Sequence, residues 1–417
     1  MSHTNLAFVD IGSSNICSII ASLNGRTVHV LGAGCVPSRG IQKGIVLDVD
    51  DAATSIRESV DKARGASGTR VHRTVVGFSS KHLSSANPMV SVETDRRDHV
   101  VTEAALLHAE RELQAIAFPE DRMKVNMVTR QYAVDNMGGI KNPLGMHGYR
   151  LDLEAHVVTA DTTYVENLAL SMRRAGLPVL SNCFVANPLA CGQAVLEPED
   201  RERGVMVADI GGGGTGLAVF KDGSIWHTSA LPVGGRQVTN DLAVGLNIPF
   251  SRAEELKTSH GSVYPNEAAE SIFSEYSSSA DQVAYIIRSR MEEILRMIIT
   301  KSPDVPGTLV LTGGGAKLAG LEQFAQELLG LKVRIGKPRA LPVVGLDDPA
   351  YAAGVGLLFW GTGAAQIEEN GNGANGGSDD LLQPFVSLLS GLRTGWITLW
   401  SRRPRIVFGP MAGPPED

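Results

Sequence analysis

The sequence contains little cysteine: 417 residues include four. Four thiols are too few for a disulfide framework, and none has a CxxC or Cys/His metal-binding spacing. We therefore predict reduced thiols and a cytoplasmic protein. The four are Cys17, Cys35, Cys183 and Cys191.

Three further features are missing. No apolar run reaches the ~18 residues that a membrane-spanning helix needs, and the start, MSHTNLAFVD, lacks the basic-then-apolar pattern of a signal segment. Basic residues are not in excess, since the net charge is −7. These absences argue against secreted and polytopic membrane proteins and predict no nucleic-acid partner.

Apolar residues make up 43% of the chain, enough for a large core. At ~150 residues per domain, this length suggests two or three domains or one two-lobed unit. Apolar patterns predict strands and helices along the whole chain. Strands are expected at 6–23 (a hairpin), 28–36, 71–78, 178–185, 205–220 (a hairpin) and 308–312, and helices at 51–64, 102–117, 162–175, 253–260, 279–300 and 352–359.

Two of these predicted hairpins carry an aspartate followed by a glycine turn. After Asp10 come Gly12, Ser13, Ser14 and Asn15, and after Asp209 come Gly211, Gly212, Gly213 and Gly214. Such turns can point amides and hydroxyls at phosphate, while the acid holds Mg²⁺ through water. Each alone is as well explained by an ordinary turn. Two copies facing each other across a cleft would grip one triphosphate and its metal from both sides.

Two other patterns fit the same site. The strand at 308–312 ends in Gly313, Gly314 and Gly315, followed by Lys317, and could let a nucleoside lie against the backbone. Glu254 and Lys257 share one face of a helix and could bind ribose and adenine. A strand–helix connection and a solvated ion pair are the simpler explanations.

The order of these motifs over ~300 residues resembles the actin-like ATPase fold. Within that fold the chain resembles the FtsA family, the bacterial actin homologues that tether FtsZ to the membrane. Three segments carry the resemblance over about residues 5–361. They are Ser38–Asp48, the run VDNMGGIKNPLGMHGYRL at 134–151, and Gly234–Lys257.

The resemblance implies a two-lobed α/β fold with ATP and Mg²⁺ between Asp10 and Asp209, and it places Asn187 where relatives orient the attacking water. Asn15, Asn187, Gly214 and Gly216 depart from the family pattern, so we expect at most slow ATP hydrolysis. The expected parts are lobe I (1–83 and 166–190) with an inserted α+β subdomain (84–165), lobe II (191–240 and 301–361) with its own insert (241–300), a flexible linker (362–380), an amphipathic helix (381–405) and a tail (406–417).

The segment 381–405 has a helical apolar stripe and four arginines without an acid. We interpret it as an interfacial membrane anchor for anionic lipid, in preference to a helix docked on its own domain or a spanning helix. The residues expected at the membrane are Phe385, Leu388, Leu389, Leu392, Arg393, Trp396, Trp400, Arg402 and Arg403.

The resemblance also implies partners. Arg288 and Arg290, on the helix at 279–300, lie where the family captures the acidic and apolar C-terminal peptide of FtsZ. The insert at 84–165 would form a self-contact in filaments, and later division proteins would be recruited. The chain is thus expected to polymerise at the division site, on the inner face of the cell membrane. A type IV pilus assembly ATPase of the PilM kind and a small-molecule kinase of the same superfold remain as alternatives.

Overall fold

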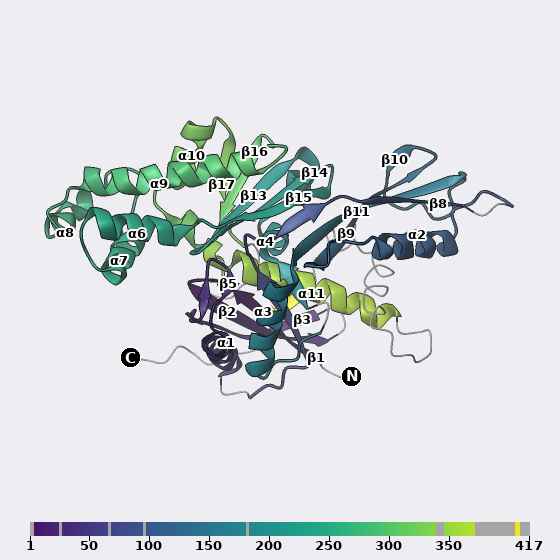
Figure 1. Ribbon diagram of the computed structural model, residues 1–417, viewed down its shortest axis with the longest axis horizontal. Helices are drawn as coiled ribbons and strands as arrows, with labels where there is room; N and C mark the ends of the chain where they lie inside the picture. The colour runs from purple at the N-terminus through teal and green to yellow at the C-terminus, as the bar shows by residue number, and fades with distance from the viewer. Residues whose placement is uncertain are drawn as a thin grey trace.

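The computed structural model describes residues 4–24, 27–65, 68–94, 97–180, 183–338, 346–371 and 405–408. It has two lobes, each built on a mixed β-sheet, and each lobe carries an insertion (Figure 1). Of the helices in these ranges, none is both long and apolar enough to cross a membrane.

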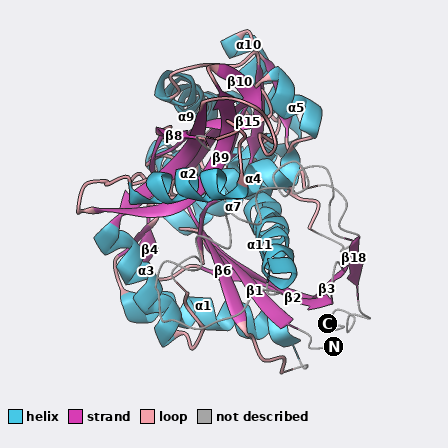
Figure 2. Ribbon diagram, turned by 90° about the vertical axis from the view of Figure 1, so that its right-hand side faces the viewer, coloured by secondary structure: helices cyan, strands magenta, loops and turns pink. Residues whose placement is uncertain are grey.

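Lobe I is a three-layer α/β/α unit. Its sheet has the order β12-β6-β1-β2-β3-β18, with α1 and α3 on one face and α11 on the other (Figure 2). Its strands are β1 (Thr4–Ile11), β2 (Asn15–Asn24), β3 (Thr27–Pro37), β6 (Arg73–Phe78), β12 (Phe184–Ala186) and β18 (Arg405–Phe408). Its helices are α1 (Val49–Arg64), α3 (Thr162–Arg174), α4 (Asn187–Val195) and α11 (Ala352–Gly371), and a small hairpin joins β4 (Ile41–Gln42) to β5 (Ile45–Val46).

Lobe II repeats the antiparallel hairpin followed by a parallel strand. Its sheet order is β15-β14-β13-β16-β17, and its insertion is helical. The strands are β13 (Val205–Ile210), β14 (Thr215–Lys221), β15 (Ser224–Leu231), β16 (Thr308–Thr312) and β17 (Lys332–Ile335). The helices are α5 (Pro198–Arg203), α6 (Gly235–Gly245), α7 (Phe250–His260), η2 (Glu267–Ala269), α8 (Glu270–Ser274), α9 (Ala280–Lys301), η3 (Gly314–Lys317), α10 (Leu321–Leu329) and η4 (Pro349–Tyr351).

The insert of lobe I is a separate sheet with its own hydrophobic core. It contains β7 (Ser84–Ala86), β8 (Met89–Glu93), α2 (Glu103–Ala115), β9 (Arg122–Val134), β10 (Met137–Ile140) and β11 (Arg150–Asp161). The insert also contacts lobe II: the Thr228 amide of β15 donates to Ser85 Oγ at 2.9 Å, and buried His156 hydrogen-bonds Thr228 Oγ1 at 2.9 Å. Burial first, then the nearby Arg130 charge, lowers the pKa of His156 to about 3, so the ring is neutral here.

Both glycine-turn hairpins form as predicted, and four expectations need correction. The helix expected at 352–359 to close lobe II packs instead on β1, β2 and β6 of lobe I and crosses α4. Close packing explains the change, because a Cβ at Gly356 would lie 1.9 Å from the Ala190 carbonyl oxygen. This helix also continues to Gly371 through good helix formers, so 362–371 is not a flexible linker.

The other two corrections concern a disulfide and a strand. Cys17 and Cys35 lie opposite each other on β2 and β3, with Cα atoms 4.1 Å apart, and form a disulfide, so these two thiols are not reduced. Cys183 and Cys191 are free and buried. The strand expected at 178–185 is confined to Phe184–Ala186, after a stretch that begins with Pro178, which lacks an amide for a sheet ladder.

Candidate nucleotide-binding site

The two hairpins place Asp10 and Asp209 at equivalent positions. Asp10 is the penultimate residue of β1 and Asp209 the penultimate residue of β13. Each strand also pairs in parallel with a second strand, β6 in lobe I and β16 in lobe II. Ligands of open α/β sheets bind outside such carboxyl ends.

The two carboxylates share one poorly solvated environment. Burial, then the Asp209 charge, raises the pKa of Asp10 to about 7. Burial raises the pKa of Asp209 to about 6. Two neighbouring carboxylates that resist ionisation favour a cation between them.

Asn187 belongs to this site, as expected from its sequence position. It begins α4, and its Nδ2 donates to Asp10 Oδ1 at 2.7 Å. Its Oδ1 is buried and accepts no hydrogen bond from the described residues. A Cβ at Gly77 would lie 2.3 Å from this oxygen, so Gly77 leaves it room. The site therefore retains one unused acceptor beside the carboxylate.

The first and second glycine turns touch each other. A Cβ at Gly212 would lie 2.0 Å from Ser14 Oγ, and one at Gly213 would lie 2.5 Å from Ser13 Oγ. Ser13 Oγ also accepts from the Gly44 amide at 2.8 Å. A side chain at either position would therefore displace Ser13 or Ser14 from its place against the second turn.

Each turn closes on itself by the same kind of hydrogen bond. The Gly12 amide donates to the Asn15 carbonyl at 3.1 Å, and the Gly211 amide donates to the Gly214 carbonyl at 2.9 Å. The start of α6 then holds the second turn, since the Gly235 amide donates to the Gly211 carbonyl at 2.9 Å.

Glu254 and Lys257 lie beside this helix start and bind each other. Lys257 Nζ is 2.7 Å from Glu254 Oε2, 2.8 Å from Thr239 Oγ1 and 3.2 Å from the Gly235 carbonyl oxygen. Glu254 also accepts from the Thr239 hydroxyl. The pair is thus coupled to the second turn, and its predicted contact with ribose and adenine stays a prediction.

The third glycine run adjoins Asp209. Gly313 has a φ of 82°, and a Cβ there would lie 2.3 Å from Asp209 Oδ1. A Cβ at Gly315 would lie 2.4 Å from Ile210 Cγ2, whereas Gly314 faces open space. The backbone at Gly314 is therefore accessible to a flat ligand.

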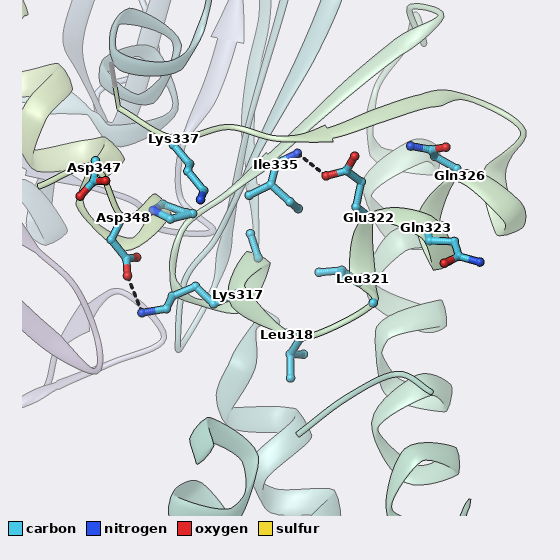
Figure 3. A pocket seen from close by; sticks show the side chains of 13 residues that line it. Lys317, Leu318, Leu321, Glu322, Gln323, Gln326, Ile335, Lys337, Asp347 and Asp348 are labelled. Atoms are coloured by element: carbon cyan, nitrogen blue, oxygen red, sulfur yellow. Dashed lines mark hydrogen bonds and ion pairs between the residues drawn. The ribbon is translucent and has the colours of Figure 1, made fainter. Parts of the chain in front are cut away.

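Lys317 points into a cavity that the sequence did not reveal. Its Nζ pairs with an Asp348 oxygen at 2.5 Å at the edge of a space of about 800 Å³ lined by α10 and the 347–349 turn (Figure 3). Asp348 does not belong to any recognisable sequence motif. Its contact with Lys317 therefore could not be predicted and arises from the folding of the chain.

The arrangement suits a magnesium–phosphate complex. Mg²⁺ is usually held by one or two carboxylates, with water and phosphate completing the shell. Asp10 and Asp209 are two such carboxylates. Among the described residues, no cluster of three or more candidate metal ligands occurs. The sequence did not single out Gly77. Gly44 and Thr239 belonged to the family-like segments Ser38–Asp48 and Gly234–Lys257, but the contacts that they make join distant segments and were not predicted.

The two arginines expected to bind FtsZ both have partners in the structure. Arg290 Nε lies 2.5 Å from Asp241 Oδ2, and its Nη1 also pairs with Glu293. The hydrogen bond that Arg290 donates to Asp241 raises the pKa of Arg290. The Arg288 guanidinium lies 4.9 Å from the centre of the Phe324 ring. The membrane residues predicted between Phe385 and Arg403 lie outside the described ranges. Arg405, expected to end the amphipathic helix, instead begins strand β18, because the run Arg405–Phe408 is rich in strand-forming residues.

Comparison with known proteins gives matches of two kinds. A family model described as "Cell division protein FtsA" matches residues 206–356, and one for the SHS2 domain inserted in FtsA matches residues 80–159. The chain is 33% identical over 373 residues to cell division protein FtsA of Pseudomonas aeruginosa, covering 85% of this chain and 88% of the relative. FtsA of Bacillus subtilis is 32% identical over 385 residues, covering 86% and 84%.

Solved structures share the fold at lower identity. A PilM–PilN type IV pilus biogenesis complex matches with a TM-score of 0.58 and 21% identity, covering 85% of this chain and 97% of that one. MreB5 of Spiroplasma citri bound to AMPPNP matches with a TM-score of 0.52 and 12% identity, covering 88% and 99%. The fold is therefore the actin-like ATPase fold with an SHS2 insert. Given the identity to its relatives over most of their length, the chain belongs to the FtsA family of cell division proteins.

Proposed function

We propose that this chain binds ATP and Mg²⁺, polymerises, and anchors the FtsZ ring to the inner face of the cytoplasmic membrane at the division site. The observation that carries the nucleotide part is the convergence of Asp10, Asp209 and the three glycine turns at one place. Solved actin-like relatives that match the chain hold ADP and AMPPNP.

Asp10 and Asp209 would hold Mg²⁺, partly through water, and the amides and hydroxyls of the first two turns would hold the phosphates. The metal would neutralise phosphate charge when bound. Mg²⁺ would offset the negative charge of these two poorly solvated carboxylates, and both turns would contact the phosphates. Together these interactions would stabilise the closed arrangement of the two lobes. Closure would favour assembly because a ligand shifts a conformational equilibrium by its differential affinity.

Hydrolysis would be slow. The Asn187 Nδ2 already donates to Asp10, which leaves Oδ1 as the one acceptor of this side chain that could hold a water. A short amide fixed in this way orients an attacking water less well than a longer side chain that reaches past the carboxylate. The chain would therefore act mainly by binding nucleotide.

The FtsZ peptide would bind at the junction of α6 and α9. Val244 and Tyr285 are 75% and 72% exposed, and Gly245 packs closely on Ile286 beside them. This apolar patch lies on the same two helices as Arg290 and its partner Asp241. A peptide with apolar and acidic residues would cover the patch and compete with Asp241 for Arg290.

Self-assembly would use the insert of lobe I. Met89, Met137 and Tyr149 are exposed there. Met89 and Met137 begin β8 and β10, and Tyr149 immediately precedes β11. Exposed apolar side chains on one subdomain are typical of an interaction surface. A head-to-tail contact through this subdomain would propagate into a filament.

The membrane anchor would be the segment 381–405, through Trp396, Trp400 and the arginines that follow. Many copies on one filament would bind far more tightly than one. Later division proteins would join this assembly.

Co-sedimentation with anionic liposomes, with and without ATP, tests the proposal. The whole chain is expected to pellet and to form filaments on lipid, whereas a Trp396→Ala/Trp400→Ala variant is expected to stay in solution. A Tyr285→Ala variant should pellet normally but lose binding to an FtsZ C-terminal peptide. Equal pelleting of the whole chain and the double tryptophan variant would refute the anchor.

A further inference from the structure

A buried asparagine of the insert is bound to the strand that leads into the nucleotide site. Asn126 lies on β9 and is 7% exposed. Its Nδ2 donates to the Phe184 carbonyl oxygen at 3.1 Å, and its Oδ1 accepts from the Ala186 amide at 2.9 Å. We propose that Asn126 is a positioning residue of the nucleotide site, which fixes the start of α4 and thereby the hydrogen bond from Asn187 to Asp10.

The two bonds of Asn126 complete one edge of lobe I's sheet. β12 is an edge strand of this sheet and pairs in parallel with β6. The Cys183 carbonyl oxygen accepts from the Val76 amide of β6, so the next carbonyl along the chain, that of Phe184, faces the other side. An asparagine side chain has both donors and an acceptor, as a neighbouring strand would. Asn126 therefore takes the place of a strand beside β12.

The backbone that Asn126 holds is the N-cap of α4. Ala186 is the N-cap residue of this helix, and its side chain makes no capping hydrogen bond, because alanine has no side-chain oxygen. Asn187 follows as the first residue of the helix. The position of Asn187 therefore depends on the contacts that other elements make with Ala186.

The start of α4 lies close to the strands next to both aspartates. Gly77 of β6 and Gly216 of β14 are their partners in the sheet register. A Cβ at Gly77 would lie 2.3 Å from Asn187 Oδ1, and one at Gly216 would lie 2.7 Å from Pro188 Cγ. A shift at the start of α4 would therefore change the surroundings of both carboxylates at once.

The insert that supplies Asn126 is also bonded to lobe II. His156, on the adjacent strand β11, hydrogen-bonds Thr228 of β15 at 2.9 Å, and Asn87 Nδ2 donates to the Trp226 carbonyl oxygen at 2.9 Å. A subunit bound to the insert and ATP bound between the lobes would thus affect each other's affinity. This consequence rests on the proposed function, whereas the contact of Asn126 with β12 does not.

Calorimetric titration of ATP with Mg²⁺ into the full chain tests the role of Asn126. Asn126→Ala and Asn187→Ala should each lower the affinity by about 2- to 10-fold, the range expected for loss of one hydrogen bond. In the Asn187→Ala background, Asn126→Ala should cause no further loss, because the residue through which it acts is gone.

Gln131→Ala is the matched control. Gln131 is an amide on the same strand, and its two hydrogen bonds, to Glu154 and from the Gly139 amide, stay within the insert. This variant should leave the ATP affinity unchanged. Asn126→Ser, with a side chain too short to reach both backbone groups, should behave as Asn126→Ala does and takes its place if the alanine variant does not fold.

Amide hydrogen exchange without nucleotide tests the contact separately. The Ala186 amide should exchange about tenfold faster in Asn126→Ala and Asn126→Ser than in the wild type and Gln131→Ala. Equal exchange at Ala186 would overturn the proposal, as would an unchanged ATP affinity or a loss that is just as large in the Asn187→Ala background. A wild type that does not bind ATP would refute the proposed function, and faster exchange at Ala186 would still show that Asn126 holds the start of α4.

Discussion

In lobe I the first hairpin presents hydroxyls after Asp10, and in lobe II the equivalent hairpin presents only backbone after Asp209. Ser13 and Ser14 pack directly on Gly212 and Gly213, so the small residues of one turn make room for the side chains of the other. A second asymmetry lies in the strands behind the turns. β2 and β3 are joined by the Cys17–Cys35 disulfide, whereas β14 and β15 have no cysteine.

These differences show how two copies of one hairpin form a single site. The turns of the pair are complementary, with side chains on one side and glycine on the other, and the charge of Asp209 reaches Asp10. We therefore expect substitutions on the two sides to have unequal effects, and the following predictions test this from the largest effect to the smallest.

A valine at Gly212 should have the largest effect on ATP affinity. Its Cβ would overlap Ser14 Oγ and force the turns apart, and overpacking of this kind costs about 1–3 kcal/mol. ATP affinity measured by calorimetry should fall by about 5- to 150-fold. Gly307→Val, at a position with open space around it, is the control, and equal losses in both variants would contradict the account.

Asparagine at Asp10 or Asp209 should change how stability depends on pH. Both pKa values are raised on folding, so the folded state binds more protons than the unfolded state between about pH 4 and 7. The stability of the nucleotide-free chain should therefore fall as pH rises through this range. A raised pKa costs about 1.4 kcal/mol per unit once the group ionises.

Each substitution should accordingly raise the melting temperature at pH 8, where the carboxylates are ionised, and change it little at pH 4. Asp10→Asn should give the larger rise because the pKa of Asp10 is raised further. Both should weaken the extra stabilisation that Mg²⁺ gives in the presence of ATP. Thermal unfolding across pH measures this, and a lower melting temperature at pH 8 for both variants would show that the carboxylates do not repel.

Reduction of the Cys17–Cys35 disulfide should destabilise lobe I. The bond closes a loop with a sequence separation of 18, for which the chain-entropy model gives about 3 kcal/mol. Dithiothreitol should lower the denaturation midpoint of the wild type and leave a Cys17→Ser/Cys35→Ser variant unchanged. A wild type that is insensitive to reductant would mean that the bond contributes nothing.

Alanine at Asn187 should have the smallest effect. It removes one hydrogen bond to the Asp10 carboxylate, worth about 0.5–1.5 kcal/mol. The pKa of Asp10 should rise by about one unit or less, moving the pH at which stability falls slightly upward. Asn240→Ala, on an exposed position of α6, is the control, and a downward shift at Asn187→Ala would contradict the assigned hydrogen bond.

Much of the site could be predicted because its residues lie next to local signals. Asp10 and Asp209 each follow an apolar strand and precede glycine, which marks the carboxyl end of a strand without knowledge of the rest. The position of Asn187 came from resemblance to the FtsA family. Its contact with Asp10 joins residues 177 apart, and nothing local indicates that bond.

The features that were missed depend on neighbours distant in sequence. Residues 352–359 form the expected helix, but only the packing of Gly356 on Ala190 shows which lobe it joins. Cys17 and Cys35 did carry a signal, since they are equally far in sequence from Arg26, which lies in the short connection between the strands predicted at 6–23 and 28–36. The pairing of β18 with β3 had none, because a parallel partner can come from anywhere in the chain.

Titration of ATP into the whole chain, with Mg²⁺ and again with EDTA, tests the central claim most directly. The account predicts one site per chain, tighter binding with Mg²⁺, and loss of this metal dependence in an Asp10→Asn/Asp209→Asn variant. Binding that is equally tight in the double variant, or that ignores Mg²⁺, would show that nucleotide does not lie between the two carboxylates.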